Sequence, residues 1–544
     1  MQNKNFFDRK IYLDILQKRV IALKDGYRQN IAIIGDELAG KTSLVHAFLS
    51  SFLDTRFVMV YVEARPETLP AFCRRFAGIL LYNFLAASHI PLKEDLDFLL
   101  EKSSVYIPKT VAKAKEIMAD AERRKKENVF SELLSLTGLI NQETGKFCVL
   151  IIDEFQNLEG LGTKSLYKEW AQRLLTEKTT LYVIISSMLY KAKAILANEL
   201  SLLFGNFEVI TVEPFDIPTS MEFLLRRMGA RAAPGHVRDT IVYFTGGNPW
   251  YLDVIADALA QSPRQDLTDT LENLLFSTSG VLHQRFTSSL KRFQDSQFSH
   301  DYLGILHLVS SGQNKIKDIA HILKKPASLV SQRVSYLLGI DVVKRWGDFL
   351  QLSDRVFGFW LKFVYQEKLQ SLTFDAVNQK ALFRRNIEQM MQEYLASCCR
   401  PVSERITELL RLFADERVQI ERRKVTLNHF REIKPLGFRG RGLKEGLLCR
   451  SLESLWIFGL SPDMLSEEDI AEFARECKKY RSKLQQKIII TMRDIDPNSR
   501  LKALEEKVWT WDLNNVNQLL DLFSRPRIIS PEPWDGSLSK PVLP

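Results

Sequence analysis

The chain of 544 residues contains no long hydrophobic run, few histidines and few cysteines. Its most apolar stretch, residues 77–87, is interrupted by Asn83 and is shorter than the roughly 20 residues that a helix needs to cross a bilayer. The N-terminal segment MQNKNFFDRK lacks the apolar stretch of a signal peptide. These absences exclude a protein built of membrane-spanning helices and favour a cytoplasmic one.

Cysteine and histidine usage favours the same class. The six cysteines form no C-x-x-C spacing, and Cys398 and Cys399 are too close together for an ordinary structural disulfide, so we expect reduced thiols. The eight histidines are scattered singly, which gives no zinc-site pattern. With 45% hydrophobic and 26% charged residues the chain has the composition of a globular protein, and its length predicts roughly three or four domains.

What the chain does contain is a loop suited to phosphate. Residues 30–44, NIAIIGDELAGKTSL, are a strand pattern followed by a G-x-x-x-x-G-K-T motif and a helix pattern. Glycines let backbone N–H groups turn toward an anion, and a helix that begins near Lys41 directs its positive dipole end at the same place. Lys41 adds a positive charge for the β- and γ-phosphates, and Thr42 offers a hydroxyl to Mg²⁺. We therefore predict that ATP contacts these loop residues: Gly35, Asp36, Glu37, Leu38, Ala39, Gly40, Lys41, Thr42 and Ser43.

A second motif lies downstream of this loop. Residues 146–158, KFCVLIIDEFQNL, begin as a continuous apolar strand pattern that ends in Asp153 and Glu154. A carboxylate at the end of a buried parallel strand can lie beside the phosphate loop. We therefore assign Asp153, together with Thr42, to Mg²⁺, and Glu154 to the general base that polarises the attacking water. Lys41 is the second catalytic residue in this assignment. A surface pair at a strand end is the alternative, and the phosphate loop upstream makes it the weaker one.

The order of the elements predicts the fold of this region. Strand patterns alternate with helix patterns, and Ser186 and Ser187 end one of the strands, where they are placed to sense the γ-phosphate. Such alternation is typical of a parallel sheet with helices on both faces and the ligand at the carboxyl ends of the strands. We therefore predict an α/β fold with strands over residues 31–34, 57–62, 146–153, 181–186 and 207–212.

Taken together, these motifs resemble a known family. The order GDELAGKTS, LIIDEFQNL, IISSM, VEPFD and TGGNPWYL is similar to that of the prokaryotic, archaeal-type AAA ATPases related to the replication-initiator and STAND proteins, over roughly residues 7–370. The resemblance implies a P-loop ATPase with a small helical lid. It also implies that Pro249, in the turn 246–249, lies at the nucleotide and reports its state to the lid. From the residues alone, a helix-capping turn is an equally good reading.

One position departs from the family's pattern. Family members often carry an arginine after a leucine-aromatic-glycine step, and here the segment LLFGN has Asn206 in that place. An arginine finger is worth about 10³ or more in rate, so we expect slow turnover or dependence on a partner's arginine. The sequence offers four alternatives and ranks none of them: Arg226, Arg227, Arg231 and Arg238.

The region that follows the lid has a different pattern. Helix patterns over 301–312, 315–323 and 328–339 precede two short strand patterns around a Gly-Asp turn, which predicts a winged helix-turn-helix, and the family is similar here too. The third helix is then the recognition helix for DNA bases, and it exposes Ser328, Ser331, Gln332 and Ser335, with Arg333 nearby. Four further cations are placed to meet phosphates: Lys324, Lys325, Lys344 and Arg345. Packing against the ATPase core or a partner protein is an equally weighted alternative.

The C-terminal part holds the densest basic stretch. The net charge of +9 favours polyanionic partners, and residues 417–450 are rich in arginine and lysine, including a glycine-rich FRGRG segment that we expect to be flexible. The acids of this stretch are Glu421, Glu432 and Glu445. This charge pattern predicts contact with a phosphate backbone.

The elements from 454 to 523 alternate between strands and helices, in an order that resembles the restriction-endonuclease-like domain of some relatives. A working nuclease of that fold needs a Glu-x-Lys on its second strand to hold Mg²⁺. Phe458 and Leu460 stand there, and Glu445 alone, as a remnant of the first acid, cannot build the site. We therefore expect a degenerate fold that binds without cutting. An unrelated α/β interaction domain is the alternative.

These readings give a domain plan and a function. We predict a P-loop ATPase core over 1–214, a helical lid over 215–296, a winged helix over 297–370, a helical connector over 371–415, a degenerate endonuclease-like domain over 416–527 and an extended tail over 528–544. The predicted function is a Mg²⁺-dependent ATPase that couples its nucleotide state to DNA binding. The alternative is a nucleotide-gated switch for a partner protein or a second copy, with little turnover.

Overall fold

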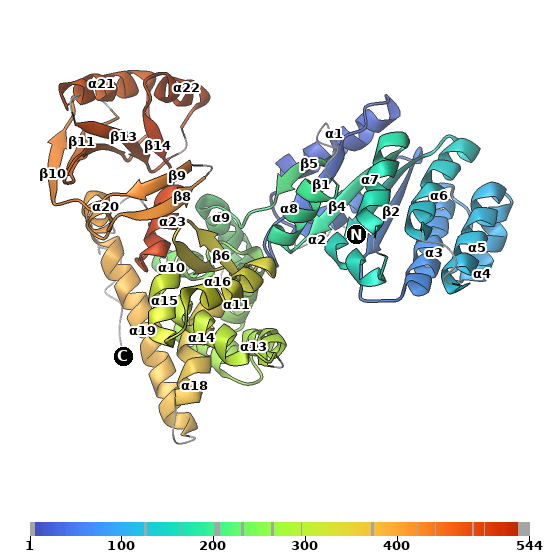
Figure 1. Cartoon of the computed structure of the whole chain (residues 1–544), viewed down its shortest axis with the longest axis horizontal. Helices are drawn as coiled ribbons and strands as arrows, with labels where there is room; N and C mark the ends of the chain where they lie inside the picture. The colour runs from blue at the N-terminus through green and yellow to red at the C-terminus, as the bar shows by residue number, and fades with distance from the viewer. Residues whose placement is uncertain are drawn as a thin grey trace. The chain divides into compact units, whose positions relative to one another are not determined.

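The computed structural model describes the chain except for residues 1–5, 124–127, 164, 201–206, 230–232, 263–265, 295, 371–374, 422, 441, 481–482, 494 and 531–544. The chain divides into two units, and each is described by itself (Figure 1). The first unit contains residues 1–219 with 248–250 and 339–341, and the second contains the remainder. In the part of the chain that the structure describes, no helix has the length and apolar character needed to cross a membrane.

A five-stranded parallel sheet forms the centre of the first unit. Its order is β2-β3-β4-β1-β5. All residues of β1 and β4 are buried, as continuous apolar runs predict for strands covered on both faces. The prediction of a parallel α/β sheet is confirmed. The strands are β1 (Asn30–Ile34), β2 (Phe57–Glu63), β3 (Phe147–Asp153), β4 (Thr180–Ser186) and β5 (Phe207–Thr211).

Two sets of helices cover the two faces of this sheet (Figure 1). Ile31 and Ile33 of β1 lie in one core with α1 (Lys10–Lys24) and α2 (Lys41–Ser51). Ala32, which points the opposite way, belongs to a second core that the other helices build. These are α3 (Leu69–Ala87), α4 (Leu96–Ser104), α5 (Pro108–Arg123), α6 (Val129–Thr144), α7 (Leu166–Thr176) and α8 (Leu189–Asn198), with the 3₁₀ helix η1 (Phe155–Leu161).

Helices make up the first half of the second unit. Three of them, α14 (Ser299–Ser310), α15 (Ile316–Leu323) and α16 (Ala327–Gly339), precede the antiparallel hairpin of β6 (Val343–Trp346) and β7 (Phe349–Leu352). This is the element order expected of a winged helix, and that assignment stays a prediction. The other helices are α9 (Ile217–Met228), α10 (Gly235–Thr245), α11 (Pro249–Gln261), α12 (Leu267–Leu271), η3 (Glu272–Phe276), α13 (Val281–Gln294), α17 (Arg355–Trp360), η4 (Leu361–Tyr365), α18 (Gln366–Gln370), α19 (Ala376–Cys398) and α20 (Val402–Arg411).

A second five-stranded sheet, in the order β10-β11-β12-β13-β14, lies in the C-terminal part of this unit. The pairings from β10 to β12 are antiparallel and those from β12 to β14 are parallel. Its strands and the helices that follow them are β10 (Glu432–Gly437), β11 (Glu445–Arg450), β12 (Leu455–Ser461), α21 (Glu467–Cys477), η5 (Lys478–Tyr480), β13 (Leu484–Thr491), α22 (Pro497–Glu505), β14 (Trp509–Trp511) and α23 (Leu513–Leu522).

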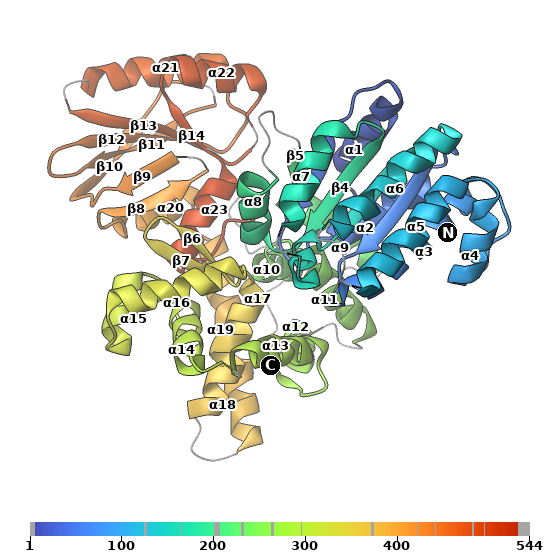
Figure 2. The same ribbon diagram turned by 45° about the vertical axis from the view of Figure 1, so that its right-hand side comes forward.

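Other elements pack on both faces of this sheet (Figure 2) and form a hydrophobic core on each. Ile457 and Ile489 pack with α21 and α22 on one face. Phe458 and Ile488 pack on the other face with α20, α23 and a separate hairpin of β8 (Glu416–Ile420) and β9 (Arg423–Leu427). The elements from β12 onward follow the expected order. The strands from β8 to β11 were not predicted, because residues 417–450 were interpreted only as a basic stretch. The endonuclease-like assignment stays a prediction.

Candidate nucleotide-binding site

The loop between β1 and α2 has a backbone that requires glycine at both motif positions. A Cβ added to Gly35 would lie 2.3 Å from the carbonyl oxygen of Val212. Gly40, the N-cap of α2, has a φ of 89°, in the left-handed region that favours glycine. Val212 N donates to Ile34 O over 2.7 Å and fixes the neighbouring chain at this end of β1. Substitution of either glycine would therefore distort the loop.

The other predicted loop residues differ in exposure. Ala39 is buried in the core that β1 shares with α1 and α2. Asp36 and Leu38 are half-buried, and Leu38 has a φ of 64°. Glu37 and Ser43 are exposed.

Lys41 lies at the first position of α2 and is 5% exposed. Its ammonium donates to the carbonyl of Gly35 over 3.1 Å and to that of Asp36 over 2.7 Å. Burial lowers the pKa of Lys41, and the nearby carboxylates of Glu154 and Asp153 offset part of that effect. An ammonium held inside the loop by carbonyl oxygens can turn its protons to phosphate oxygens instead.

Asp153, at the end of β3, joins two strands to the phosphate loop. Its Oδ2 accepts from Thr42 Oγ1 over 2.9 Å and from the Tyr61 hydroxyl over 2.6 Å. Its Oδ1 accepts from Glu154 N over 2.9 Å. Tyr61 belongs to β2, the neighbour of β3, and the sequence analysis did not select it. Burial and then the hydrogen bond to Asp153 raise the pKa of Tyr61, so its hydroxyl stays protonated and donates.

Glu154 has a φ of 50° and is held by three donors. Its Oε2 accepts from Ser187 Oγ over 2.8 Å, from Ser187 N over 3.2 Å and from Gln156 Nε2 over 2.5 Å. Ser187 follows β4, so this contact joins the ends of β3 and β4. Ser186 is buried and donates to Met188 O instead. Of the two serines expected to sense phosphate, only Ser187 therefore reaches the acidic pair.

The oxygens of Thr42 and Asp153 suit a hard cation. Mg²⁺ prefers oxygen ligands and usually keeps waters and phosphate oxygens around it, so one hydroxyl and one carboxylate are a sufficient protein contribution. Among the residues that the structure describes, no group of three or more His, Cys, Asp or Glu side chains could hold a metal ion. The two predicted metal ligands thus fit a Mg²⁺ that arrives with a nucleotide.

The turn predicted to sense the nucleotide, residues 246–249, ends in the first unit. Residues 248–250 belong to that unit. Asn248 Nδ2 donates to Glu37 O over 3.4 Å, and a Cβ on Gly40 would lie 3.9 Å from Pro249 Cγ. Pro249 therefore lies next to Gly40 of the phosphate loop.

Arg9 is a second residue that the sequence analysis missed. Its guanidinium donates to Glu213 O over 2.6 Å and to Ala39 O, in the phosphate loop, over 3.3 Å. It also lies over the ring of Phe215 at 4.8 Å. Burial lowers the pKa of Arg9. Since its partners are far away along the chain, no local pattern could have identified it.

The position of the missing arginine lies outside the described residues, since Asn206 and Arg231 both fall in gaps. The three other candidates, Arg226, Arg227 and Arg238, belong to the second unit. Arg227 forms ion pairs of 2.6 Å with Asp253 and with Asp257. None of the described candidates therefore belongs to the unit that carries the phosphate loop.

The helix expected to read DNA bases is α16, and most of its predicted contact residues are exposed to solvent. Ser328, Gln332 and Ser335 of α16 are exposed, and Ser331 is half-buried. Arg333 and Lys325 both form ion pairs with Asp301, the first at 3.2 Å. These two cations therefore hold α14 and α16 together. Among the other predicted phosphate contacts, Lys324 and Arg345 are exposed, and Lys344 is half-buried.

The tip of the β6–β7 hairpin is engaged within the second unit. Asp348 N donates to Arg417 O, and Arg417 N donates to Asp348 Oδ2, both over 2.9 Å. A Cβ on Gly347 would lie 2.3 Å from Arg417 O, and Phe349 belongs to the core of the C-terminal sheet. The hairpin tip thus packs on β8.

The basic stretch contains both paired and unpaired cations. Lys434 and Arg450 share Glu432, at 2.7 and 3.9 Å. Arg422 and Arg441 lie outside the described residues. Six exposed cations form no ion pair with any residue that the structure describes: Arg417, Arg423, Lys424, Arg431, Arg439 and Lys444.

The C-terminal sheet has apolar side chains where a nuclease needs metal ligands. Phe458 of β12 is fully buried and Leu460 is 6% exposed. Glu445, at the start of β11, is exposed and pairs in register with Leu460. Phe458 and Leu460 therefore offer no oxygen ligand for Mg²⁺ at the two positions where a nuclease of that fold would need its Glu-x-Lys.

The part of the chain that contains the phosphate loop matches a known protein family. Residues 6–255 match the model of a family described as an ATPase domain predominantly from Archaea. No curated protein matches the chain. A Walker-type ATPase of Pyrococcus abyssi is similar in structure, with 19% identity, 66% of this chain and 97% of that chain covered, and a TM-score of 0.46.

Two further solved structures are similar. The ORC2 protein of Aeropyrum pernix, in ADPNP–ADP complexes, has 11% identity, with 72% of this chain and 98% of that chain covered and a TM-score of 0.39. The RuvB Holliday junction branch migration motor of Thermotoga maritima has 12% identity, 68% and 97% covered and a TM-score of 0.31. Over residues 6–255 the chain is therefore similar to an ATPase domain found predominantly in Archaea.

Proposed function

We propose that the first unit is a Mg²⁺-dependent ATPase. The observation that carries the proposal is the contact of 2.9 Å between Thr42 Oγ1 and Asp153 Oδ2, near the buried ammonium of Lys41. The match of residues 6–255 to an ATPase domain family supports it. Together these residues supply a cation for phosphate oxygens and two oxygen ligands for a metal, one in the first turn of α2 and one at the end of β3.

Each residue has a separate task in this proposal. Backbone N–H groups of the loop and Lys41 hold the β- and γ-phosphates, and Thr42 and Asp153 hold Mg²⁺. Bound Mg²⁺ neutralises charge on the phosphates. Glu154 takes the proton of the attacking water, while Ser187 and Gln156 orient its carboxylate.

Substitutions in the loop and in β3 test this assignment. Lys41→Ala should abolish ATP binding measured by calorimetry, because the phosphates lose their one buried cation. Asp153→Asn should still bind ATP without Mg²⁺, but it should lose the gain in affinity that Mg²⁺ provides and lose turnover. Lys93→Ala, at an exposed position, is the matched control. Undiminished hydrolysis by Lys41→Ala would contradict the proposal.

We propose further that the second unit couples the nucleotide state to duplex DNA. The six unpaired cations of residues 417–450 and the exposed polar side chains of α16 support this. Lysine and arginine contacts to phosphates release counterions, so affinity should fall steeply with salt. Lys424→Glu and Lys444→Glu should weaken binding and reduce the salt slope, whereas Lys93→Glu should not. Binding that is insensitive to salt, or that survives both reversals, would refute DNA coupling.

A partner-protein switch is the second candidate, and one observation favours it. The hairpin tip that a DNA-binding winged helix would offer to a groove is packed on Arg417 of β8. A hairpin that already packs on another segment of the same chain is also suited to packing on a partner protein. Recovery of a salt-insensitive partner in the presence of ATP but not ADP would favour this candidate over DNA coupling.

A further inference from the structure

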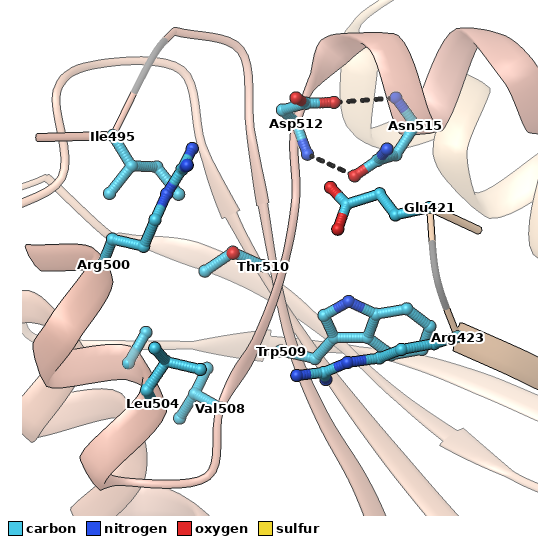
Figure 3. A pocket seen from close by; sticks show the side chains of 11 residues that line it. Glu421, Arg423, Ile495, Arg500, Leu504, Val508, Trp509, Thr510, Asp512 and Asn515 are labelled. Atoms are coloured by element: carbon cyan, nitrogen blue, oxygen red, sulfur yellow. Dashed lines mark hydrogen bonds between the residues drawn. The ribbon is translucent and has the colours of Figure 1, made fainter. Parts of the chain in front are cut away.

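A pocket of about 150 Å³ opens along β14, the edge strand of the C-terminal sheet (Figure 3). Strand β14 supplies Trp509 and Thr510, and helix α22 supplies Arg500 and Leu504. The turn between β8 and β9 brings Glu421 and Arg423 to the same place. The remaining lining residues are Ile495, Ala503, Val508, Asp512 and Asn515.

Two arginines line the pocket, and neither has a carboxylate partner among the described residues. Arg423 lies over the ring of Trp509, with its guanidinium carbon 5.4 Å from the ring centroid. Arg500 projects from α22 on the opposite side of the pocket (Figure 3). Both residues are exposed, and the nearby carboxylates of Glu421 and Asp512 form no ion pair with them. A guanidinium stacked on a ring keeps its edge donors for a planar or tetrahedral anion.

The other walls differ in chemistry. Leu504 and Val508 form an apolar wall below Arg500, on the face of β14 opposite to that of Trp509 and Arg423 (Figure 3). Glu421 and Asp512 lie across from Arg500 and offer carboxylate oxygens. One oxygen of Asp512 is used, since Oδ1 accepts from Asn515 N over 2.8 Å. The pocket therefore combines an anion site, an apolar wall and hydrogen-bond acceptors.

We propose that this pocket binds a nucleoside phosphate, either free or as the phosphorylated end of a strand. The phosphate would lie between Arg423 and Arg500, and the base against Leu504 and Val508. Glu421 and Asp512 would accept from the amino or hydroxyl groups of the nucleoside. The inference stands apart from ATP hydrolysis in the first unit. Its strand-end form rests on the proposed nucleic-acid binding, and its free form does not.

Calorimetry on the full chain tests the pocket, in a Lys41→Ala background that silences the phosphate loop. The probes are AMP, adenosine, inorganic phosphate, and oligodeoxyadenylates with a 5′-phosphate or a 5′-hydroxyl. Arg423→Ala and Arg500→Ala should each weaken AMP binding by about tenfold or more, because each removes a charge-assisted hydrogen bond. Arg500→Lys should give an intermediate loss, since it keeps the charge without the fork.

Arg475→Ala is the matched control, because Arg475 is exposed, unpaired among the described residues and outside both the pocket lining and the basic stretch. It should change AMP affinity by less than about twofold. Preference for the 5′-phosphorylated oligonucleotide over both the hydroxyl form and AMP assigns the strand end, and tighter binding of AMP assigns the free nucleotide. Absence of AMP binding, equal binding of adenosine and AMP, or losses no larger in the pocket variants than in the control would each overturn the proposal.

Discussion

The hydroxyl of Tyr61 lies 2.6 Å from Oδ2 of Asp153, the same oxygen that accepts from Thr42. Groups that hydrogen-bond a metal ligand orient it, and their loss typically costs about 10- to 100-fold in metal affinity or activity. We therefore expect Tyr61→Phe to raise the Mg²⁺ concentration needed for half-maximal ATP hydrolysis by about tenfold. The measurement is turnover against Mg²⁺ concentration at saturating ATP.

A control separates this effect from a general change in the fold. Tyr190 is 57% exposed, so Tyr190→Phe should leave the Mg²⁺ dependence unchanged. If Tyr61→Phe has the Mg²⁺ dependence of wild type, the hydroxyl does not position Asp153 for the metal.

The contact between Ser187 and Glu154 predicts a second kinetic effect. Ser187→Ala removes a 2.8 Å hydrogen bond to the carboxylate, although its backbone N–H remains. We expect kcat to fall by about tenfold with little change in KM, because the base is less well oriented. Ser187→Thr keeps the hydroxyl and should recover much of the rate. A rise in KM with unchanged kcat would instead assign Ser187 to ATP binding.

Asp521 predicts how the stability of the second unit depends on pH. Its carboxylate is buried and forms ion pairs with Arg355 of α17 and, at 2.6 Å, with Arg527. Burial alone raises the pKa of Asp521, but the two arginines outweigh it and hold the pKa below its ordinary value. Because the folded pKa is depressed, the stabilisation is present above the unfolded pKa of about 3.9 and is lost as the pH falls through the folded pKa.

Replacement of this carboxylate should therefore change both the size and the pH profile of stability. Asp521→Asn should lower the free energy of unfolding at pH 7 by about 3 kcal/mol, since two half-buried cations lose their partner. The free energy of unfolding, measured by urea unfolding at a series of pH values, should also fall less steeply in acid for Asp521→Asn than for wild type. Asp463→Asn, at an exposed position, is the control. If the free energy of unfolding of Asp521→Asn falls as steeply with decreasing pH as that of wild type, other groups cause the loss of stability in acid.

Gly347 predicts a steric effect at the hairpin tip. Its φ is 70°, and an added Cβ would lie 2.3 Å from Arg417 O and 2.9 Å from Val418 Cα. Gly347→Ala should destabilise the second unit by about 1–3 kcal/mol, because backbone atoms must move. At Gly437 no atom lies within 4 Å of the added Cβ, so Gly437→Ala should cost less than about 0.5 kcal/mol. Equal unfolding midpoints for the two variants would mean that the hairpin tip is not tightly packed.

The sequence predicted the first sheet well and the C-terminal hairpins poorly, for a physical reason. Strands β1 and β4 are buried at every position, so their sequences are continuous apolar runs. Strand β8 alternates instead, with Val418 and Ile420 buried and Arg417 exposed. This alternation with a period of two is visible in the sequence, but the high positive charge led to the interpretation of residues 417–450 only as a basic stretch.

The candidate site was predictable where its chemistry is local. Lys41 and Thr42 follow from one loop motif, and Asp153 and Glu154 follow from one strand end. Tyr61 could not be found in this way, because it reaches Asp153 only through the pairing of β2 with β3. Gln156 lies only two residues after Glu154, but no sequence motif predicts its hydrogen bond to the Glu154 carboxylate.

The most direct test of the account is ATP hydrolysis by wild type and by Glu154→Gln, each with and without duplex DNA. The account predicts measurable Mg²⁺-dependent turnover by wild type that DNA accelerates. It predicts ATP binding by Glu154→Gln with turnover reduced by about 10² or more, because the base is lost. Turnover in Glu154→Gln equal to that of wild type, or wild-type turnover that DNA leaves unchanged, would contradict it.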